Sequence, residues 1–377
     1  MRRRELLGLL GTGALGAACI PAAGVHPAAA AEGEQHLLYV ASPGIRNYTE
    51  WGGVGVLVFD MARDYRWVRR IPTLPEVAGQ PAENVKGICA CARTARLYAS
   101  TIKRLMCLDL LTDRMLWNRT YEGGCDRMSI TPDGKWIYLP SLEGAFWNVV
   151  DGETGEVARR IEPNSGAHNT VVGLNGRYAY LAGLKSPLLP VVDTRTQEIV
   201  RRAGPFSHVI RPFTVNGSQT LAYVNVNDLL GFEIGDLRTG KLLHRVEVSG
   251  FQRGPVRRHG CPSHGVGLTP DEREVWVVDG HNEHVHIFDN TAMPPRLVAS
   301  LRLREQPGWV TFTLDGRRAL LSTGEIIDVK TRKIVHALAD ELGRPVHSEK
   351  VVEIVFRDGK PVRNGDQFGL GRKQRGG

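Results

Sequence analysis

The sequence is poor in cysteine and lacks the short motifs that mark several large classes of enzyme. Its 377 residues include six cysteines, and five remain once Cys19 is removed with the N-terminal segment described below. An odd number excludes complete intramolecular pairing, so the chain is not a disulfide scaffold. It contains no CxxC, CxxCH, GxSxG or Walker A motif. These absences argue against haem attachment, a nucleophile elbow and a phosphate-binding loop.

The first 31 residues have the pattern of an export signal. The basic start MRRR precedes an apolar stretch of Leu, Gly and Ala and then a run of alanines. Residues 3–7, RRELL, resemble the twin-arginine export motif. We therefore predict that residues 1–31 are cleaved and that the mature protein is periplasmic or secreted. Lipidation at Cys19 is the less favoured alternative, because Gly16 occupies the position three residues before it. No other apolar run is long enough to span a bilayer.

Residues 32–366 repeat one short pattern, in which an apolar strand opens with an aromatic residue and a second strand ends at an aspartate. These aspartates are Asp60, Asp109, Asp151, Asp193, Asp236, Asp289 and Asp328. They follow one another at intervals of 39 to 53 residues. Four strands in a unit of about 40–50 residues match a blade of a β-propeller. We predict an all-β fold, a single seven-bladed propeller with four-stranded antiparallel blades.

The two ends of the chain predict how the ring closes. The first unit, HLLYVAS, begins at its aromatic strand and lacks an innermost strand. Residues 350–357, KVVEIVFR, form an isolated strand near the C-terminus. We expect this strand to complete the first blade and to leave no open sheet edge. Residues 367–377 are predicted to be a basic, disordered tail.

At the level of family, the repeated YVxS strand followed by DxxTGxV resembles the YVTN-repeat seven-bladed propellers, a group related to the β-chain of quinoprotein amine dehydrogenase. The resemblance covers essentially the whole mature chain. It implies a fold and a place for a site at the central channel. It does not imply one activity, because similar propellers include binding proteins, lactonases and lyases.

Alignment of the seven units on their turns predicts a ring of polar residues where the innermost strands begin. The ring comprises Lys86, Asp126, Arg127, His168, Asn169, Arg211, His264 and Trp309. A long insertion at 43–54 adds Arg46 and Trp51, and the sixth unit adds His281. Because innermost strands start at one face of the channel, we expect these side chains to surround a ligand site. Trp309 and Trp51 are expected to stack on a sugar ring.

These residues favour a protein that binds a small anionic or sugar-like ligand, or a protein partner, at the mouth of the channel. The alternative is a metal-independent polysaccharide lyase or lactonase. In it His168 and His264 act as acid and base and Arg or Lys stabilises negative charge. A third reading is an interaction scaffold that uses the rim loops.

Cofactor and nucleic-acid binding are weakly supported by the sequence. No cofactor is predicted; a divalent metal, if one binds, would use His168, His264, His281 and Asp126. The formal net charge is +8, but basic and aromatic residues are not interleaved in any one segment, so nucleic-acid binding is not favoured.

Overall fold

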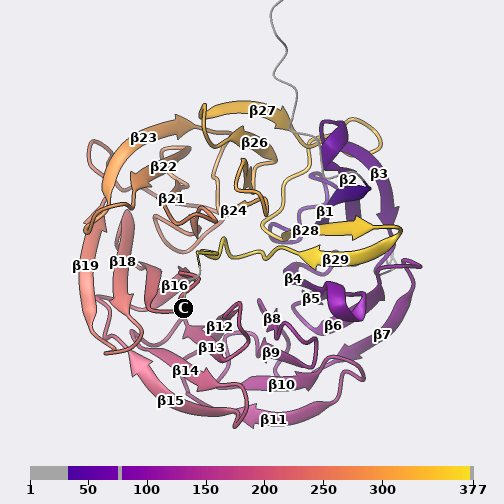
Figure 1. The fold of residues 1–377 in the computed structure, drawn as a ribbon, viewed down its shortest axis with the longest axis horizontal. Coiled ribbons are helices and arrows are strands. Elements are labelled where there is room, and N and C mark those ends of the chain that lie inside the picture. Colours follow the sequence, from indigo (N-terminus) through magenta and orange to yellow (C-terminus); the bar gives the residue numbers. More distant parts are fainter. Residues whose placement is uncertain (1–32, 75–78, 374–377) are drawn as a thin grey trace, which may run out of the picture.

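Seven antiparallel sheets are arranged around a central axis (Figure 1). The structure, a computed structural model, describes residues 33–74 and 79–373. The predicted seven-bladed propeller is confirmed. The expected signal segment 1–31, with Cys19, lies outside the described residues.

The blades follow one another along the chain. Blade 1 consists of β1 (Glu34–Ser42), β2 (Gly55–Asp60) and β3 (Arg66–Ile71) with β28 (Val351–Arg357) and β29 (Lys360–Asn364) from the C-terminal region. Blades 2 and 3 consist of β4 (Val85–Cys91), β5 (Arg96–Thr101), β6 (Arg104–Asp109) and β7 (Met115–Thr120), then β8 (Ser129–Ile130), β9 (Trp136–Pro140), β10 (Trp147–Asp151) and β11 (Val157–Ile161). Blades 4 and 5 consist of β12 (Ala167–Val172), β13 (Tyr178–Gly183), β14 (Leu189–Asp193) and β15 (Glu198–Ala203), then β16 (Ile210–Val215), β17 (Leu221–Val226), β18 (Gly231–Asp236) and β19 (Leu242–Glu247). Blades 6 and 7 consist of β20 (Val266–Leu268), β21 (Glu274–Asp279), β22 (His284–Asp289) and β23 (Arg296–Arg302), then β24 (Val310–Phe312), β25 (Arg318–Leu321), β26 (Glu325–Asp328) and β27 (Lys333–Ala337). Two short 3₁₀ helices, η1 (Met61–Arg63) and η2 (Ala92–Thr94), follow β2 and β4.

The repeated aspartate has a local structural reason. Asp151 ends β10, and its Oδ1 accepts hydrogen bonds from the backbone N–H groups of Glu153 and Thr154, each at 2.9 Å. Asp328 does the same in blade 7, where the N–H of Thr331 donates at 2.8 Å. Such a turn satisfies backbone donors that would otherwise be unpaired, and it directs the chain into the outermost strand.

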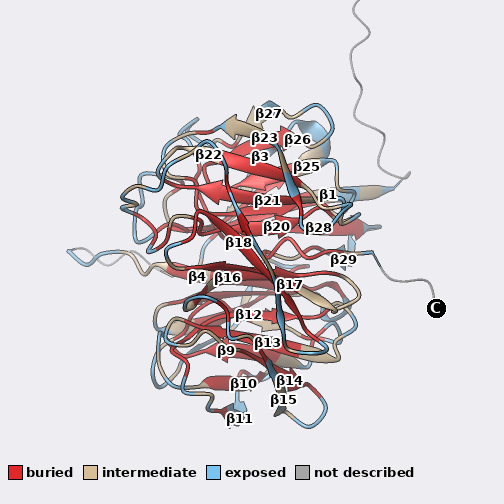
Figure 2. Ribbon diagram, turned by 90° about the vertical axis from the view of Figure 1, so that its left-hand side faces the viewer, coloured by how far each residue is buried: buried red, intermediate tan, exposed pale blue. Residues whose placement is uncertain are grey.

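The repeated aromatic residue has a packing reason. Tyr98, Tyr138, Tyr180 and Tyr223 are fully or almost fully buried, at 0–1% exposure. Tyr138 of blade 3, for example, packs in one cluster with Ala179 and other residues of blade 4. Figure 2 shows that burial is concentrated in the inner strands, while outermost strands such as β11 and β15 carry exposed residues. The core therefore consists of layers between adjacent blades.

The ring closes through blade 1, as predicted. β28 pairs antiparallel with β1 over its whole length, from Glu34 opposite Arg357 to Val40 opposite Val351. β29 then pairs with the other side of β28, so this sheet has five strands.

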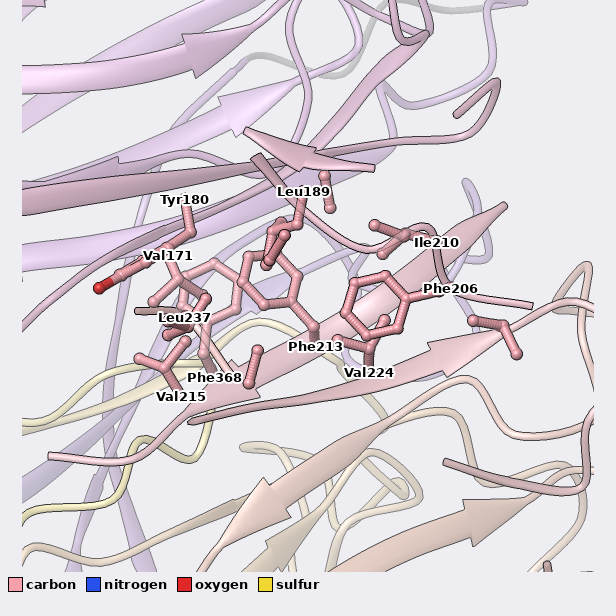
Figure 3. Close-up of a cluster of buried hydrophobic side chains, with 14 of the residues drawn as sticks. Val171, Tyr180, Leu189, Phe206, Ile210, Phe213, Val215, Val224, Leu237 and Phe368 are labelled. Atoms are coloured by element: carbon pink, nitrogen blue, oxygen red, sulfur yellow. The ribbon is translucent and has the colours of Figure 1, made fainter. Parts of the chain in front are cut away.

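The segment after β29 crosses the ring, as the yellow trace in Figure 1 shows. Phe368 and Leu370 are buried, and Phe368 packs beside Phe213 and Val215 between blades 4 and 5 (Figure 3). The carbonyl of Gly369 accepts hydrogen bonds from Thr214 Oγ1 and from the N–H of Leu268, each at 2.8 Å. Residues 367–371 are buried, Arg372 is half-buried and Lys373 is exposed. Residues 374–377 lie outside the described chain.

Two further features concern membrane-spanning helices and cysteines. Within the described residues, no helix is long and apolar enough to cross a membrane. Five cysteines there are free and buried: Cys89, Cys91, Cys107, Cys125 and Cys261.

We expect Phe368→Ala to lower the free energy of unfolding by about 3 kcal/mol, because it leaves a cavity where blades 4 and 5 meet the C-terminal segment. Chemical denaturation of the purified protein measures this change. Leu342→Ala is the control, because Leu342 is 71% exposed and its truncation should change stability by less than about 0.5 kcal/mol. Equal effects of the two substitutions would show that the C-terminal segment contributes nothing to the core.

Candidate functional site

A small cavity lies at the centre of the ring, on the face where the innermost strands begin. Its volume is about 120 Å³. It is lined by Ile45, Arg46, Asn84, Lys86, Arg127, Glu143, His168, Leu184, Arg211, Arg258, His259, Gly260, His264, Glu349 and Lys350. Six blades contribute at or close to the start of one strand each, namely β4, β8, β12, β16, β20 and β28. The radial arrangement of blades thus brings residues remote in sequence to one place.

Asp126 is the first of two buried carboxylates that organise the cavity. It is 1% exposed, and its Oδ2 lies 2.7 Å from Nδ1 of His168. Its Oδ1 accepts a hydrogen bond from the backbone N–H of Arg127 at 2.9 Å and lies 3.3 Å from Nζ of Lys86. Burial by itself would raise the pKa of Asp126, but the contacts with His168 and Lys86 outweigh it and lower the pKa. Asp126 is therefore ionised at neutral pH.

The hydrogen bond with Asp126 orients the imidazole ring of His168. Burial lowers the pKa of His168, although the carboxylate of Asp126 opposes the effect. A neutral imidazole that donates from Nδ1 to Asp126 keeps its lone pair on Nε2. Since His168 lines the cavity, Nε2 is the atom available to a ligand.

Glu349 is the second buried carboxylate, at 5% exposure. Its Oε2 accepts hydrogen bonds from Nη2 of Arg127 and Nζ of Lys350, both at 2.7 Å. Its Oε1 lies 3.2 Å from Nδ1 of His259 and 3.7 Å from Nδ1 of His264. Although burial opposes ionisation, these neighbours together hold the pKa of Glu349 well below its usual range.

His264 is held by the backbone and by a second imidazole. Its Nδ1 lies 2.9 Å from the carbonyl oxygen of Gly308, and its ring stacks on His259 with centroids 4.5 Å apart. Burial, and then the proximity of His259, lowers the pKa of His264 well below its ordinary value. His264 is therefore neutral near pH 7, with the Nδ1 proton directed at Gly308.

Trp309 lies beneath Arg127 and does not present a face to the cavity. It is 2% exposed, its Nε1 donates to the carbonyl of Gln367, and the guanidinium of Arg127 lies 3.8 Å from its ring centroid. The expectation that Trp309 stacks on a ligand is therefore corrected: the ring supports Arg127. Asn169 has a similar role, since its Oδ1 accepts from Nη1 of Arg127 at 3.3 Å and it is not among the lining residues.

Two further predicted residues, Trp51 and His281, do not line the cavity. Trp51 stacks on His347 with centroids 4.8 Å apart, and the guanidinium of Arg258 covers its ring at 4.0 Å. Trp51 thus supports a lining arginine and leaves no free face for a sugar. His281 is exposed and packs against Gly254, where any side chain would collide with the imidazole. Six predicted residues line the cavity: Arg46, Lys86, Arg127, His168, Arg211 and His264. The predicted Asp126 is not among the lining residues but contacts His168 and Lys86, which are.

The structure does not bring together the four residues expected to bind a metal, because His281 lies apart from the others. Among the described residues, His259, His264 and Glu349 do have ligand spacing, with one ligand atom of each within 4.8 Å of the others. Arg127 and Lys350, however, already bind the carboxylate of Glu349. A divalent cation would have to enter beside these two basic groups, so the arrangement favours an anion.

The sequence analysis missed Glu349, Lys350, His259 and Arg258. A signal was present for the first two, because they directly precede β28, the C-terminal strand that pairs with β1 in blade 1. Extending the ring of strand-start residues to that strand would have found them. His259 and Arg258 lie in the long connection between β19 and β20 and share no offset with the other blades.

No protein-family model matches the chain, and no curated protein matches it in sequence. Solved structures are similar in fold. Hydrazine synthase of Kuenenia stuttgartiensis is 15% identical, with a TM-score of 0.55 over 68% of this chain and 81% of that chain. The β-propeller domain of Cps50 (Swd1) from Myceliophteria thermophila is 14% identical, with a TM-score of 0.54 over 73% of this chain and 88% of that chain. At these identities the similarity supports the propeller fold alone.

The buried histidine His264 predicts a pH dependence of stability. Its pKa is lowered in the native state, so below the ordinary value of about 6.5 the unfolded chain binds a proton that the native chain excludes. The free energy of unfolding should therefore fall with decreasing pH below about 6.5, by up to ~1.4 kcal/mol per pH unit from this residue. Chemical denaturation at several pH values between about 5 and 8 measures the slope of the free energy of unfolding against pH.

The variant His264→Gln should have a shallower slope than the wild type over that range. The exposed His208, substituted in the same way, is the control for replacing a histidine outside the cavity. A wild-type slope retained in His264→Gln would contradict the neutral state assigned to this histidine.

Proposed function

We propose that the protein is an exported β-propeller that binds a small anionic ligand in the central cavity. The observation that carries this proposal is the charge of the lining. Five basic side chains, Arg46, Lys86, Arg127, Arg211 and Arg258, face two carboxylates, Glu143 and Glu349, and the amine of Lys350 lines the same cavity. In a site partly shielded from water, such an excess of positive charge attracts anions strongly.

Arg46 and Arg211 are the basic groups best placed to meet the ligand. Neither forms an ion pair with a carboxylate among the residues that the structure describes, whereas Arg127 and Lys350 share Glu349 and Lys86 contacts Asp126. Nη2 of Arg211 donates to the carbonyl of Gly260 at 2.9 Å, which holds the guanidinium at the cavity. An incoming carboxylate or phosphate would supply the missing partner.

The size of the cavity limits the ligand. Its volume of about 120 Å³ is below the ~300–1,000 Å³ of sites for drug-sized ligands. One carboxylate- or phosphate-bearing group fits, or the acidic end of a sugar acid, while a longer oligosaccharide would extend over the rim.

The proposal of export rests on the sequence of residues 1–31, with its basic start, apolar stretch and alanine run. Five buried thiols without a disulfide among the described residues suit export after folding. The YVTN-like repeats place the chain, in this proposal, among the exported propellers of that group.

The anion proposal predicts that Arg211→Ala weakens binding by about 10- to 100-fold, because one charge-assisted contact of ~1.5–3 kcal/mol is lost. Calorimetric titration with phosphate, sulfate, glucuronate and glucose measures affinity and selectivity. Arg302→Ala is the matched control, since this arginine lies on the outermost strand of blade 6 with its side chain 78% exposed. The proposal would be refuted if the wild type bound glucose as tightly as it binds glucuronate. It would also be refuted if Arg211→Ala bound the anions as tightly as the wild type does.

A second candidate function, a lyase or lactonase, is favoured by the contact between Asp126 and His168. A buried carboxylate that holds a neutral imidazole in one tautomer is the arrangement of a general base. His168 would remove a proton next to a carboxylate, or activate water against a lactone, and the cavity cations would stabilise the developing negative charge. The lowered pKa leaves His264 neutral at pH 7 with its proton on Nδ1, so its Nε2 carries no proton to donate as a general acid.

For this candidate, His168→Ala should reduce turnover of uronate oligosaccharides or lactones by at least ~100-fold, the usual contribution of a general base. Formation of unsaturated or hydrolysed product is followed over time, with His208→Ala as a control on an exposed histidine. If the wild-type protein converts none of these compounds, the lyase and lactonase activities are excluded and the binding proposal is unaffected.

A further inference from the structure

Lys350 is a buried amine that the binding proposal does not explain. It directly precedes β28, is 3% exposed and lines the cavity. Its Nζ donates to the carbonyl oxygen of Gly44 at 2.8 Å and to Oε2 of Glu349 at 2.7 Å. These two bonds fix the nitrogen at the wall of the cavity.

The hydrogen bonding of Nζ matches a neutral amine. An ammonium group has three N–H donors and a neutral amine has two. Among the described residues Nζ has two acceptors, which is the number that the two N–H groups of a neutral amine require, and Lys350 lines the cavity. Burial lowers the pKa of Lys350 to about 7, and Arg127 adds to this effect while Glu349 opposes it. A substantial fraction of the side chain is therefore uncharged at neutral pH, with a lone pair on nitrogen.

The surroundings of Lys350 suit a ligand that carries both a carboxylate and a carbonyl group. Arg46 and Arg211 offer unpaired positive charge for the carboxylate, as the proposed function requires. A neutral amine in the same small cavity is a nucleophile for an adjacent carbonyl carbon. We propose that Lys350 forms a reversible Schiff base with a small 2-oxo acid. This proposal rests on the anion site proposed above.

The chemistry balances without any further reagent. The lone pair of Nζ attacks the carbonyl carbon and forms a C–N bond, while the C=O π electrons move to oxygen. Nitrogen loses both hydrogens in two successive proton transfers, and the carbonyl oxygen leaves with them as one water molecule. The product is Lys350–N=C, and nothing is oxidised or reduced. Glu349 is placed to relay these protons, because its Oε2 already contacts Nζ at 2.7 Å.

Lys86 provides an internal comparison. It lines the same cavity, but its Nζ faces the carboxylate of Asp126 at 3.3 Å and its side chain is 18% exposed. It does not have the two-acceptor arrangement of a neutral amine that Lys350 has. Selective reaction at Lys350 would therefore reflect its environment and not access to the cavity alone.

Reductive trapping tests the proposal. The full chain is incubated with pyruvate as probe and sodium cyanoborohydride at pH 6, 7 and 8, and the modified lysines are identified by peptide mass spectrometry. We expect one main carboxyethyl adduct at Lys350, at least about 10-fold above that at Lys86, with an increase from pH 6 to pH 8 as the amine loses its proton. Lys350→Arg places a guanidinium beside Glu349 that cannot act as the nucleophile, so it should abolish the adduct, with circular dichroism confirming the fold.

Three further outcomes separate this inference from the proposed function. An excess of lactate, an anion without the carbonyl, should protect Lys350 if carboxylate binding precedes reaction. Pyruvate binding in a calorimeter without selective trapping would overturn the Schiff base and leave the anion site standing. Trapping by acetone as strong as by pyruvate, with no calorimetric binding of any anion, would overturn the anion site and with it the 2-oxo acid as ligand.

Discussion

The antiparallel pairing of β1 with β28 is the interaction on which the rest of the molecule depends. It joins residues more than 300 positions apart and converts a row of seven sheets into a closed ring. The other edge of β28 is paired with β29. Closure defines the axis toward which the innermost strands face. The same C-terminal region then returns across the ring, where Phe368 fills a space between blades 4 and 5 and Gln367 meets the indole of Trp309.

Two buried carboxylates give the central cavity its chemical character. Isolated buried charges are costly, so Asp126 and Glu349 must be surrounded by donors and cations. Arg127 connects them, because its backbone N–H donates to Asp126 and its guanidinium donates to Glu349 while lying on Trp309. These contacts hold Asp126, Arg127 and Glu349 in place. The remaining basic groups at the opening have fewer partners, which leaves the mouth of the cavity positive.

Much of this arrangement could be predicted, because blades repeat and an offset within one blade holds in the next. That regularity located Lys86, Arg127, His168 and His264. It could not locate His259, which lies in a connection without a counterpart in other blades. The same regularity led to the wrong role for Trp309, which was expected to stack on a ligand. The offset of a residue within a blade does not reveal whether its ring faces the axis or packs against a neighbouring side chain. Trp51 and His281 came from loops of irregular length, whose paths depend on packing and not on strand register.

The sequence by itself determined the fold class, the blade count and the strand that closes the ring, because turn aspartates and buried aromatics recur with the period of a blade and act through local hydrogen bonds and layer packing. Only the tertiary structure decided which polar residues meet. The contacts of Glu349 with Arg127 and of Lys350 with Gly44 join positions over 200 residues apart in the chain. The protonation of such groups depends on burial and on the neighbouring charges, which exist only once the ring has closed.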